Sequence, residues 1–446
     1  MKKIKIKVLI SFCFLLFAAS CSNGEEIKKF PNLEDKYDPS QPKGVISMSP
    51  LVGRVDDNFV LEGNFGKDIS KMKVYFGERK AVLLKTNGQT LHGLVPKQPA
   101  GDNPITVVLE EDSIVTDIKF RYRQFQNVVT VTGSWEKRQD WWQGEFKDGP
   151  LDQATFSYIS GVTVVAGGNL IVGESAFARL RFVSIEDNEV VRISGDWGPA
   201  FDQGATTSDR ETAYFVECYN SHRLFRLDRS NTWEPVQIRS SIPELTGEVR
   251  SSTFGSDDRY MYIRDNHGNF GRIDVENKAD NYPFELLMQN ANGNSEGMNR
   301  LCYSKFSDCF YATSPAEHGI YKIWEDKAAQ QWKIERYAGF NGTGYSEGNR
   351  LTDAKFNFPT GICADNYGNV YVTNQSNHTI FKIWLSTERV EHVAGKYTEG
   401  WVEKPVIVGK PLESQLLNPS SIAMDEEENF FIPSQGGHEI HKYSIE

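Results

Sequence analysis

The chain has 446 residues, enough for roughly three domains of about 150 residues each, although a single all-β domain can exceed 200 residues. Its composition, with 39% hydrophobic and 24% charged residues, excludes wholesale disorder, collagen and a polytopic membrane protein. The first twenty residues hold four Lys and no acidic residue, so the rest has 45 basic and 60 acidic residues, a net charge of −15. Because nucleic-acid binding needs a basic surface, this charge argues against a nucleic-acid partner.

Residues 1–20 have the pattern of a secretory signal peptide, with four lysines before the apolar run Val8 to Ala19. That run is about a dozen residues long, which is too short for a bilayer-spanning helix. The small residues directly before Cys21 resemble the lipobox of bacterial lipoproteins, which implies that Cys21 is lipidated and that a lipid anchor holds the chain in a membrane. The alternative is a plain secretory signal followed by a chance cysteine.

Residues 21–42 are polar, contain three Pro and show no periodicity, which predicts a flexible lipidated tether. Residues 22–26, SNGEE, resemble the tag that sends lipoproteins of polysaccharide-degrading gut bacteria to the outer cell surface. The localisation implied by this resemblance is the outer membrane, with the protein facing outward.

The cysteines after Cys21 are too few for a disulfide scaffold in a chain of this length, and we expect mainly buried thiols. Cys302 and Cys309 flank a predicted hairpin, so a disulfide between them is an open alternative. The sequence has no CxxC spacing of the kind that binds zinc.

Residues 43–125 predict a small β-sandwich, because short alternating runs at 59–63, 73–77 and 105–109 are separated by turn residues. Gly66 and Gly77 fit turn positions that need a positive φ. The order of landmarks resembles the immunoglobulin-like IPT/TIG domain over its whole length. These landmarks are Ser49-Pro50, Gly63-Asn64-Phe65-Gly66, Val74-Tyr75-Phe76-Gly77, Val95-Pro96 and Gly101.

Residues 126–446 repeat themselves, most clearly where residues 361–383 match residues 421–443. Successive copies end at Val183, Leu227, Ile273, Ile323, Ile383 and Tyr443, in steps of 44, 46, 50, 60 and 60 residues. Six units of this length predict a six-bladed β-propeller. The fold class is therefore all-β, a small sandwich followed by a propeller.

The repeat text resembles the NHL repeat, on residues 354–361, Asn377-His378 and residues 390–395. The last copy stops at Glu446 without an outer strand, whereas residues 128–133 form an isolated strand before the first copy. We expect that strand to complete the last blade and to close the ring, which removes exposed sheet edges.

Five histidines fall in one repeat position, namely His222, His267, His318, His378 and His438, and Ala178 takes that position in a degenerate first copy. A metal ring like that of some propeller lyases is one interpretation. A residue that recurs once per blade is better explained by a hydrogen bond that fixes the turn between the second and third strands, since a metal needs three or four convergent ligands. Asp365 and Asp425 predict Asx turns rather than calcium loops. No metal or cofactor is therefore expected.

No catalytic residue stands out. The sequence lacks GxSxG, HExxH and a glycine-rich phosphate loop. A pair of carboxylates of the glycosidase type stays open, because acidic residues are abundant and none is singled out.

The loops expected on one propeller face are rich in aromatic residues. The predicted ligand-binding residues are Trp141, Trp142, Trp197, Tyr345 and Trp401. Trp141 and Trp142 lie in a polar stretch, where core packing explains them poorly, whereas Trp324 and Trp384 fit packing positions in two blades. The alternative is that all these rings cap the loops between blades.

Exposed aromatic rings among polar side chains suit sugars, whose apolar C–H faces stack on rings. One stacked face that buries on the order of 100 Å² gives roughly 2–3 kcal/mol. Two or three such rings give millimolar to micromolar affinity after the costs of binding.

The combination resembles the auxiliary lipoproteins of polysaccharide-utilisation systems. The resemblance implies a non-catalytic protein that binds polysaccharides or oligosaccharides and works with outer-membrane import proteins. One alternative is a propeller enzyme, a lyase or hydrolase acting at the central channel. Another is a platform for protein partners of the import complex.

Overall fold

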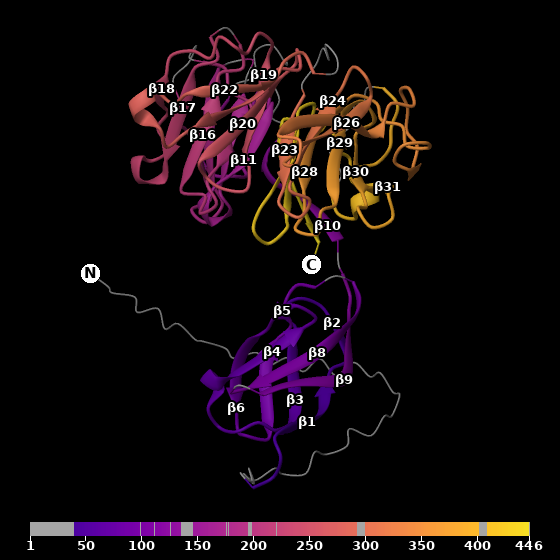
Figure 1. Cartoon of the computed structure of the whole chain (residues 1–446). Helices are drawn as coiled ribbons and strands as arrows, with labels where there is room; N and C mark the ends of the chain where they lie inside the picture. The colour runs from indigo at the N-terminus through magenta and orange to yellow at the C-terminus, as the bar shows by residue number, and fades with distance from the viewer. Residues whose placement is uncertain are drawn as a thin grey trace, which may run out of the picture. The chain divides into compact units, whose positions relative to one another are not determined.

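The computed structural model describes residues 40–98, 100–110, 112–124, 126–134, 146–174, 176, 178–194, 199–219, 221–291, 299–400 and 408–445. These residues are β-structure joined by turns and short 3-10 segments, and they separate into two compact units between Tyr122 and Arg123 (Figure 1). Within the described ranges, no helix is long and apolar enough to cross a membrane.

The first unit is a sandwich of two sheets. One sheet has the order β1 (Gly44–Ser49), β3 (Asn58–Asn64), β7 (Thr90–Leu94) and β6 (Val82–Thr86). The other has the order β2 (Val52–Gly53), β9 (Asp112–Tyr122), β8 (Gly101–Leu109), β4 (Met72–Phe76) and β5 (Arg79–Lys80). The three alternating runs expected as strands are β3, β4 and β8.

The two sheets of this unit share one hydrophobic core. Phe76 packs edge-to-face on Phe59 and Phe120, with ring centroids 5.2 and 5.1 Å apart. Gly66 and Gly77 have φ values of 93° and 56°, which confirms the expected turn positions. The predicted sandwich is therefore confirmed.

The second unit forms six antiparallel sheets among its described residues. The first sheet is β11 (Gly161–Val164), β12 (Leu170–Glu174), β13 (Arg179–Ser184) and β14 (Glu189–Arg192). The second is β15 (Ala205–Thr206), β16 (Thr212–Val216), β17 (Leu224–Asp228) and β18 (Val236–Arg239). The third is β19 (Val249–Phe254), β20 (Tyr260–Asp265), β21 (Phe270–Asp274) and β22 (Phe284–Met288).

The fourth sheet is β23 (Leu301–Ser304), β24 (Cys309–Ser314), β25 (Gly319–Asp326) and β26 (Gln331–Gly339). The fifth is β28 (Pro359–Ala364), β29 (Val370–Asn374), β30 (Thr379–Ile383) and β31 (Arg389–Ala394), with β27 (Gly348–Asn349) at its edge. The sixth is β32 (Ala423–Met424), β33 (Phe430–Ser434), β34 (Glu439–Ile445) and β10 (Gln126–Gly133).

The sixth sheet joins the two ends of this unit. β10 pairs antiparallel with β34, and Val128 lies opposite Tyr443. Both side chains are fully buried in one cluster with Ile432. The pairing confirms that the strand expected before the first copy completes the last sheet.

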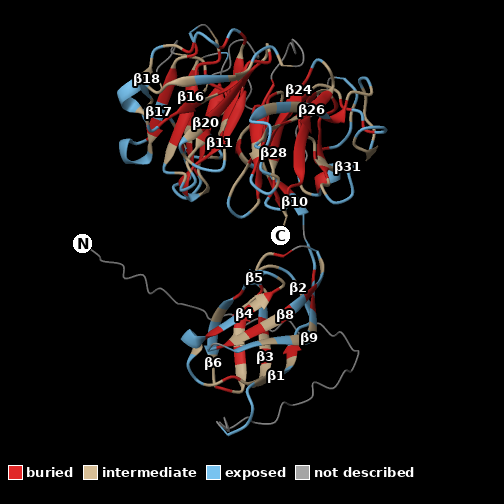
Figure 2. Cartoon of the chain, in the orientation of Figure 1, coloured by how far each residue is buried: buried red, intermediate tan, exposed pale blue. Residues whose placement is uncertain are grey.

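Successive sheets pack face to face through strands that are buried on both sides, such as β12 and β29 (Figure 2). Tyr311 of the fourth sheet shares a cluster with Val372 of the fifth, and Phe431 of the sixth shares one with Val164 of the first. Because the last sheet packs on the first, the unit has the arrangement of a β-propeller.

The four described cysteines are free and buried. Cys302 lies opposite Tyr311, and Cys309 lies opposite Ser304, so the two thiols do not face each other across the ladder. The alternative of a Cys302–Cys309 disulfide is therefore wrong. Burial raises the pKa of both thiols.

The closing strand offers a matched test of the ladder. Val128→Ala removes fully buried methyl groups and should lower the free energy of unfolding by about 1–3 kcal/mol. Val129→Ala on the same strand removes a side chain that is 40% exposed and should change it by less than about 0.5 kcal/mol. Urea denaturation measures both variants. Equal losses would contradict the packing of β10 described above.

Candidate functional site

One face of the second unit carries the turns between second and third strands and the connections from one sheet to the next. We call it the loop face. The sheets are antiparallel throughout, so these turns and connections emerge at the same end of the strands. Polar side chains from several sheets meet where the first strands begin at this face.

Arg300 crosses between sheets at the loop face. It directly precedes β23, and its Nη2 donates to the Ser160 carbonyl oxygen at 2.5 Å and to Asp202 Oδ1 at 2.6 Å. Ser160 directly precedes β11, and Asp202 lies shortly before β15. The Arg300 and Asp202 side chains are 0% and 1% exposed. One guanidinium group therefore ties the fourth sheet to the first and second sheets.

Arg250 of β19 is the second cation at Asp202. Its Nη1 lies 3.5 Å from Asp202 Oδ2, and its Nη2 donates to Glu248 Oε2 at 2.7 Å. Its guanidinium lies over the Tyr219 ring, 4.9 Å from the centroid. Burial alone lowers the pKa of Arg250, but the Asp202 carboxylate and other nearby groups outweigh burial and raise it above its usual value. Asp202 is therefore the shared counter-ion of two arginines.

Two glycines of the first sheet allow Asp202 to approach. A Cβ on Gly161 would lie 2.5 Å from Asp202 Oδ1, and one on Gly173 would lie 2.5 Å from the Asp202 carbonyl oxygen. Real Cβ contacts are not that short, so any side chain at either position would displace Asp202. The first sheet therefore fixes where the carboxylate sits.

Gln375 and Gln435 lie on the turns between second and third strands of the fifth and sixth sheets. Gln375 Nε2 donates to Gln435 Oε1 at 3.3 Å. We call Asp202, Arg250, Arg300, Tyr219, Gln375 and Gln435 the axial cluster. Its side chains come from five sheets. Burial raises the pKa of Tyr158, which Arg250, Asp202, Gln435 and Arg300 also influence, so the glutamine pair lies near the ion pairs.

Several buried atoms of the axial cluster make no hydrogen bond to the described residues. They are Arg300 Nε and Nη1, Asp202 Oδ2 and Gln435 Nε2. Buried polar atoms in proteins are normally satisfied, either by protein groups or by a bound polar molecule. The cluster therefore has buried donors and a buried acceptor whose hydrogen bonds the described residues do not supply.

Tyr345 is the one predicted ligand-binding residue within the described ranges; Trp141, Trp142, Trp197 and Trp401 lie outside them, as does Cys21. Tyr345 is half-buried, and its hydroxyl lies 2.8 Å from His392 Nδ1. Its ring centroid lies 4.2 Å from that of Tyr397 and 5.3 Å from that of Phe381. Tyr345 therefore packs on the outer strands of the fifth sheet and is not part of the axial cluster.

The recurring histidines hold turns and connect neighbouring sheets. The imidazole Nδ1 of His318 accepts the Phe358 N–H at 3.3 Å, and that of His378 accepts the Asn418 N–H at 3.0 Å. His438 Nδ1 bonds to the Ser157 carbonyl of the first sheet. His222 Nδ1 lies 3.1 Å from the Glu217 carbonyl oxygen, which is a bond within the turn as predicted. The other three bonds differ from the prediction, because they reach the next sheet.

The assignment of His267 to the repeat position is wrong. His222, His318, His378 and His438 have φ between 50° and 61°, and Ala178 has 52°. In the turn between the second and third strands of the third sheet, the residue with positive φ is Gly268, at 83°, and His267 precedes it. His267 Nδ1 instead lies 3.0 Å from Thr246 Oγ1.

Asp365 and Asp425 form the expected Asx turns. Asp365 Oδ1 accepts the N–H groups of Tyr367 and Asn369 at 3.0 and 2.8 Å. Asp425 accepts two backbone N–H groups in the same way. Among the described residues, no group of three or more His, Cys, Asp or Glu could hold a metal ion.

Comparison with known proteins supports this fold. Residues 356–383 match the NHL repeat. A solved protein of unknown function from Bacteroides thetaiotaomicron has a TM-score of 0.81 and 28% identity, over 92% of this chain and 100% of its own. No curated protein matches the sequence.

Two further solved structures share the fold at lower identity. They are auxiliary nutrient binding proteins, one from Bacteroides thetaiotaomicron and one from Bacteroides ovatus. Their TM-scores are 0.58 and 0.59, at 19% and 18% identity. They cover 93% and 92% of this chain, and 100% and 99% of their own chains.

Removing the shared counter-ion should destabilise the second unit. Asp202→Ala leaves two buried guanidinium groups without it, and we expect a loss of about 3–5 kcal/mol in the free energy of unfolding. The double variant Asp202→Ala with Arg300→Met should lose less than Asp202→Ala alone, because it removes the fully buried charge as well. Urea denaturation compares them. A double variant as unstable as the sum of both single variants would contradict the coupling.

The histidine bonds predict a loss of stability in acid. Nδ1 of His378 accepts a hydrogen bond only when it is unprotonated, and burial lowers the pKa of this imidazole. The unfolded chain then binds a proton near pH 6.5 that the folded chain does not, so stability falls as the pH drops below about 6.5. His378→Asn keeps a residue that tolerates positive φ and should flatten the stability profile between about pH 7 and 5. An unchanged slope would contradict this role.

Proposed function

We propose that the chain is an outer-membrane, cell-surface lipoprotein that binds glycans without cleaving them. In this proposal Cys21 carries the lipid, and residues 43–125 are an IPT/TIG domain that acts as a spacer. Residues 126–446 are a six-bladed NHL propeller whose loop face binds the glycan. Outer-membrane import proteins are the proposed partners.

The axial cluster is the observation that carries this proposal. A sugar hydroxyl donates one hydrogen bond and accepts others, so it pairs with arginine donors, with a carboxylate acceptor and with amides that offer both. Tyr219 adds a half-buried ring beside these groups. In the sequence, the proposed aromatic residues Trp141, Trp142, Trp197 and Trp401 fall between the last strand of one sheet and the first strand of the next.

The similar solved structures support the proposal at the level of fold. Two of them are named auxiliary nutrient binding proteins, and each covers more than nine-tenths of this chain. A nutrient captured at a cell surface for import is consistent with the signal, lipobox and surface tag that the first 26 residues resemble. Many anchored copies that engage one polymer would gain avidity from weak single sites.

The contacts of the carboxylates favour binding over hydrolysis. A glycosidase needs two carboxyl groups that flank the scissile bond, one of them as an acid. Of the described carboxylates near the axial cluster, Asp202 is held by two guanidinium groups and Glu248 by Arg250. Both act as counter-ions here.

Affinity electrophoresis of residues 22–446 through gels with plant, microbial and host polysaccharides tests the proposal, with product analysis on the same samples. We expect retardation by at least one polysaccharide and no new reducing ends. Trp141→Ala with Trp142→Ala should abolish the retardation. Tyr367→Ala is the matched control, because Tyr367 is 39% exposed on a turn at the opposite face.

The axial cluster needs its own variant in the same assay. Tyr219→Ala removes a half-buried ring and should weaken the retardation about tenfold, the effect of roughly 1.4 kcal/mol. Cleaved polysaccharide in the samples would contradict non-catalytic binding and would favour an enzyme. Retardation that survives both the tryptophan pair and Tyr219→Ala would move the site away from the loop face, and no retardation on a broad panel would contradict glycan binding.

A further inference from the structure

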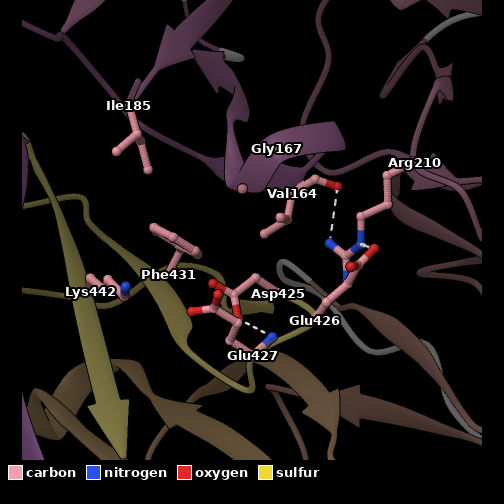
Figure 3. Close-up of a pocket in the computed structure, with 10 residues that line it drawn as sticks. Val164, Gly167, Ile185, Arg210, Asp425, Glu426, Glu427, Phe431 and Lys442 are labelled. Carbon is pink, nitrogen blue, oxygen red and sulfur yellow. Dashed lines mark hydrogen bonds and ion pairs between the residues drawn. The ribbon is translucent and has the colours of Figure 1, made fainter. Parts of the chain in front are cut away.

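A pocket lies on the face opposite the loop face, between the sixth and first sheets, with Arg210 reaching it from the second sheet. It has a volume of about 390 Å³. Its lining includes Val164, Ile185, Arg210, Glu427, Phe431 and Lys442 (Figure 3). The turns that frame it join first to second strands or third to fourth strands, so they emerge at the end of the sheets away from the axial cluster. We call it the junction pocket.

The junction pocket exists because a turn contact made at other junctions is missing. Between the fourth and fifth sheets, the Phe306 ring lies against Gly368, so close that a Cβ there would come within 2.8 Å of it. Between the fifth and sixth sheets, Asn366 Nδ2 donates to Glu428 Oε1 at 2.8 Å. Between the sixth and first sheets, a Cβ on Gly168 would meet no atom within 4 Å.

The third strands show the same difference. Lys322 lies over the Trp324 ring, and Lys382 lies 3.5 Å from the Trp384 ring centroid. The sixth sheet has Lys442 at the same position, but Ser444 stands where the other two sheets have tryptophan. Within the described part of the chain, the Lys442 ammonium group makes no hydrogen bond or ion pair. The Lys442 ammonium group therefore faces the pocket without a neighbouring indole ring.

The charged groups of the pocket lie around an apolar floor. Phe431 and Val164 point into the space between the sheets, with Lys442 and Arg210 on opposite sides of it (Figure 3). Arg210 is occupied, since its Nη2 donates to the Met424 carbonyl at 3.0 Å and its Nε lies 3.7 Å from Glu426. Burial lowers the pKa of Arg210.

We propose that the junction pocket binds a neutral mono- or disaccharide. Its lining carries the carboxylates of Asp425, Glu426 and Glu427 against the cations of Arg210 and Lys442, so a further anion would be repelled. A hydroxylated neutral ligand can donate to a carboxylate and accept from the Lys442 ammonium group. Phe431, Val164 and Ile185 would face its apolar side.

The size of the pocket limits the ligand. About 390 Å³ lies near the lower end of the range of small-molecule pockets, which runs from about 300 to 1,000 Å³. A mono- or disaccharide matches this volume better than a segment of polymer. The inference shares the ligand class of the proposed function but uses a different face and different residues, so each can fail without the other.

Saturation-transfer NMR on residues 22–446 tests the proposal, with glucose, galactose, mannose, xylose, maltose, cellobiose and lactose at about 20 mM, a concentration suited to millimolar affinity. Glucuronate is the charged probe, and we expect it to bind more weakly than glucose. Glu426→Phe introduces a ring like that of Phe306, which covers the junction of the fourth and fifth sheets. Lys442→Met removes the ammonium group. Each should weaken sugar binding at least tenfold.

Two controls separate this site from the loop face and from misfolding. Glu335→Phe adds a ring on an exposed position of the outer strand β26 and should leave binding unchanged. Trp141→Ala with Trp142→Ala should also leave the binding of these small sugars unchanged, whatever it does to polysaccharide retardation. Thermal denaturation shows whether each variant is folded.

The proposal is overturned if none of the seven neutral sugars binds the wild-type chain. It is also overturned if binding persists at full strength in folded Glu426→Phe and Lys442→Met, or if only the tryptophan pair abolishes it. Loss of polysaccharide retardation in the tryptophan pair, with sugar binding intact, would support both sites separately.

Discussion

The pairing of β10 with β34 is the constraint on which the second unit depends. It joins residues 126–133 to residues 439–445, so that the start of the unit completes its last sheet. Without it, β34 would expose an unpaired edge, and mainly the packing of β32, β33 and β34 would join the sixth sheet to the first. The same pairing sets the junction between the sixth and first sheets. His438 adds a bond there to the Ser157 carbonyl.

Departures from the repeat mark the places where this regular structure can bind something. At the loop face, Arg250 lies in the first strand of the third sheet and Arg300 directly before that of the fourth, and both arginines converge on Asp202. At the opposite face, the turn contacts made at the two preceding junctions are missing beside Gly168, where the junction pocket lies. The first difference adds charged side chains to the axial cluster. The second leaves an unfilled space between the sixth and first sheets.

The sequence allowed the sandwich strands, the closing strand and the role of the histidines to be predicted, because alternation, repeat length and a recurring residue are local signals. The axial cluster was missed, since Asp202 and Arg300 are 98 residues apart and only the ring of sheets brings them together. The sequence signal that could have indicated the cluster was the presence of Arg250 and Arg300 near the starts of two first strands. His267 was misplaced because the turn of the third sheet puts Gly268 at the positive-φ position. The junction pocket lies where a turn contact between neighbouring sheets is missing, and a search for motifs does not detect a missing contact.

Hydrogen–deuterium exchange with and without a polysaccharide that retards the chain tests the central claim most directly, since it reports where a glycan sits without any mutation. The account predicts slower exchange in the loop-face turns at residues 217–223, 373–379 and 433–439, which carry Tyr219, Gln375 and Gln435. Slower exchange confined to residues 44–122, with these turns unchanged, would contradict binding by the propeller face.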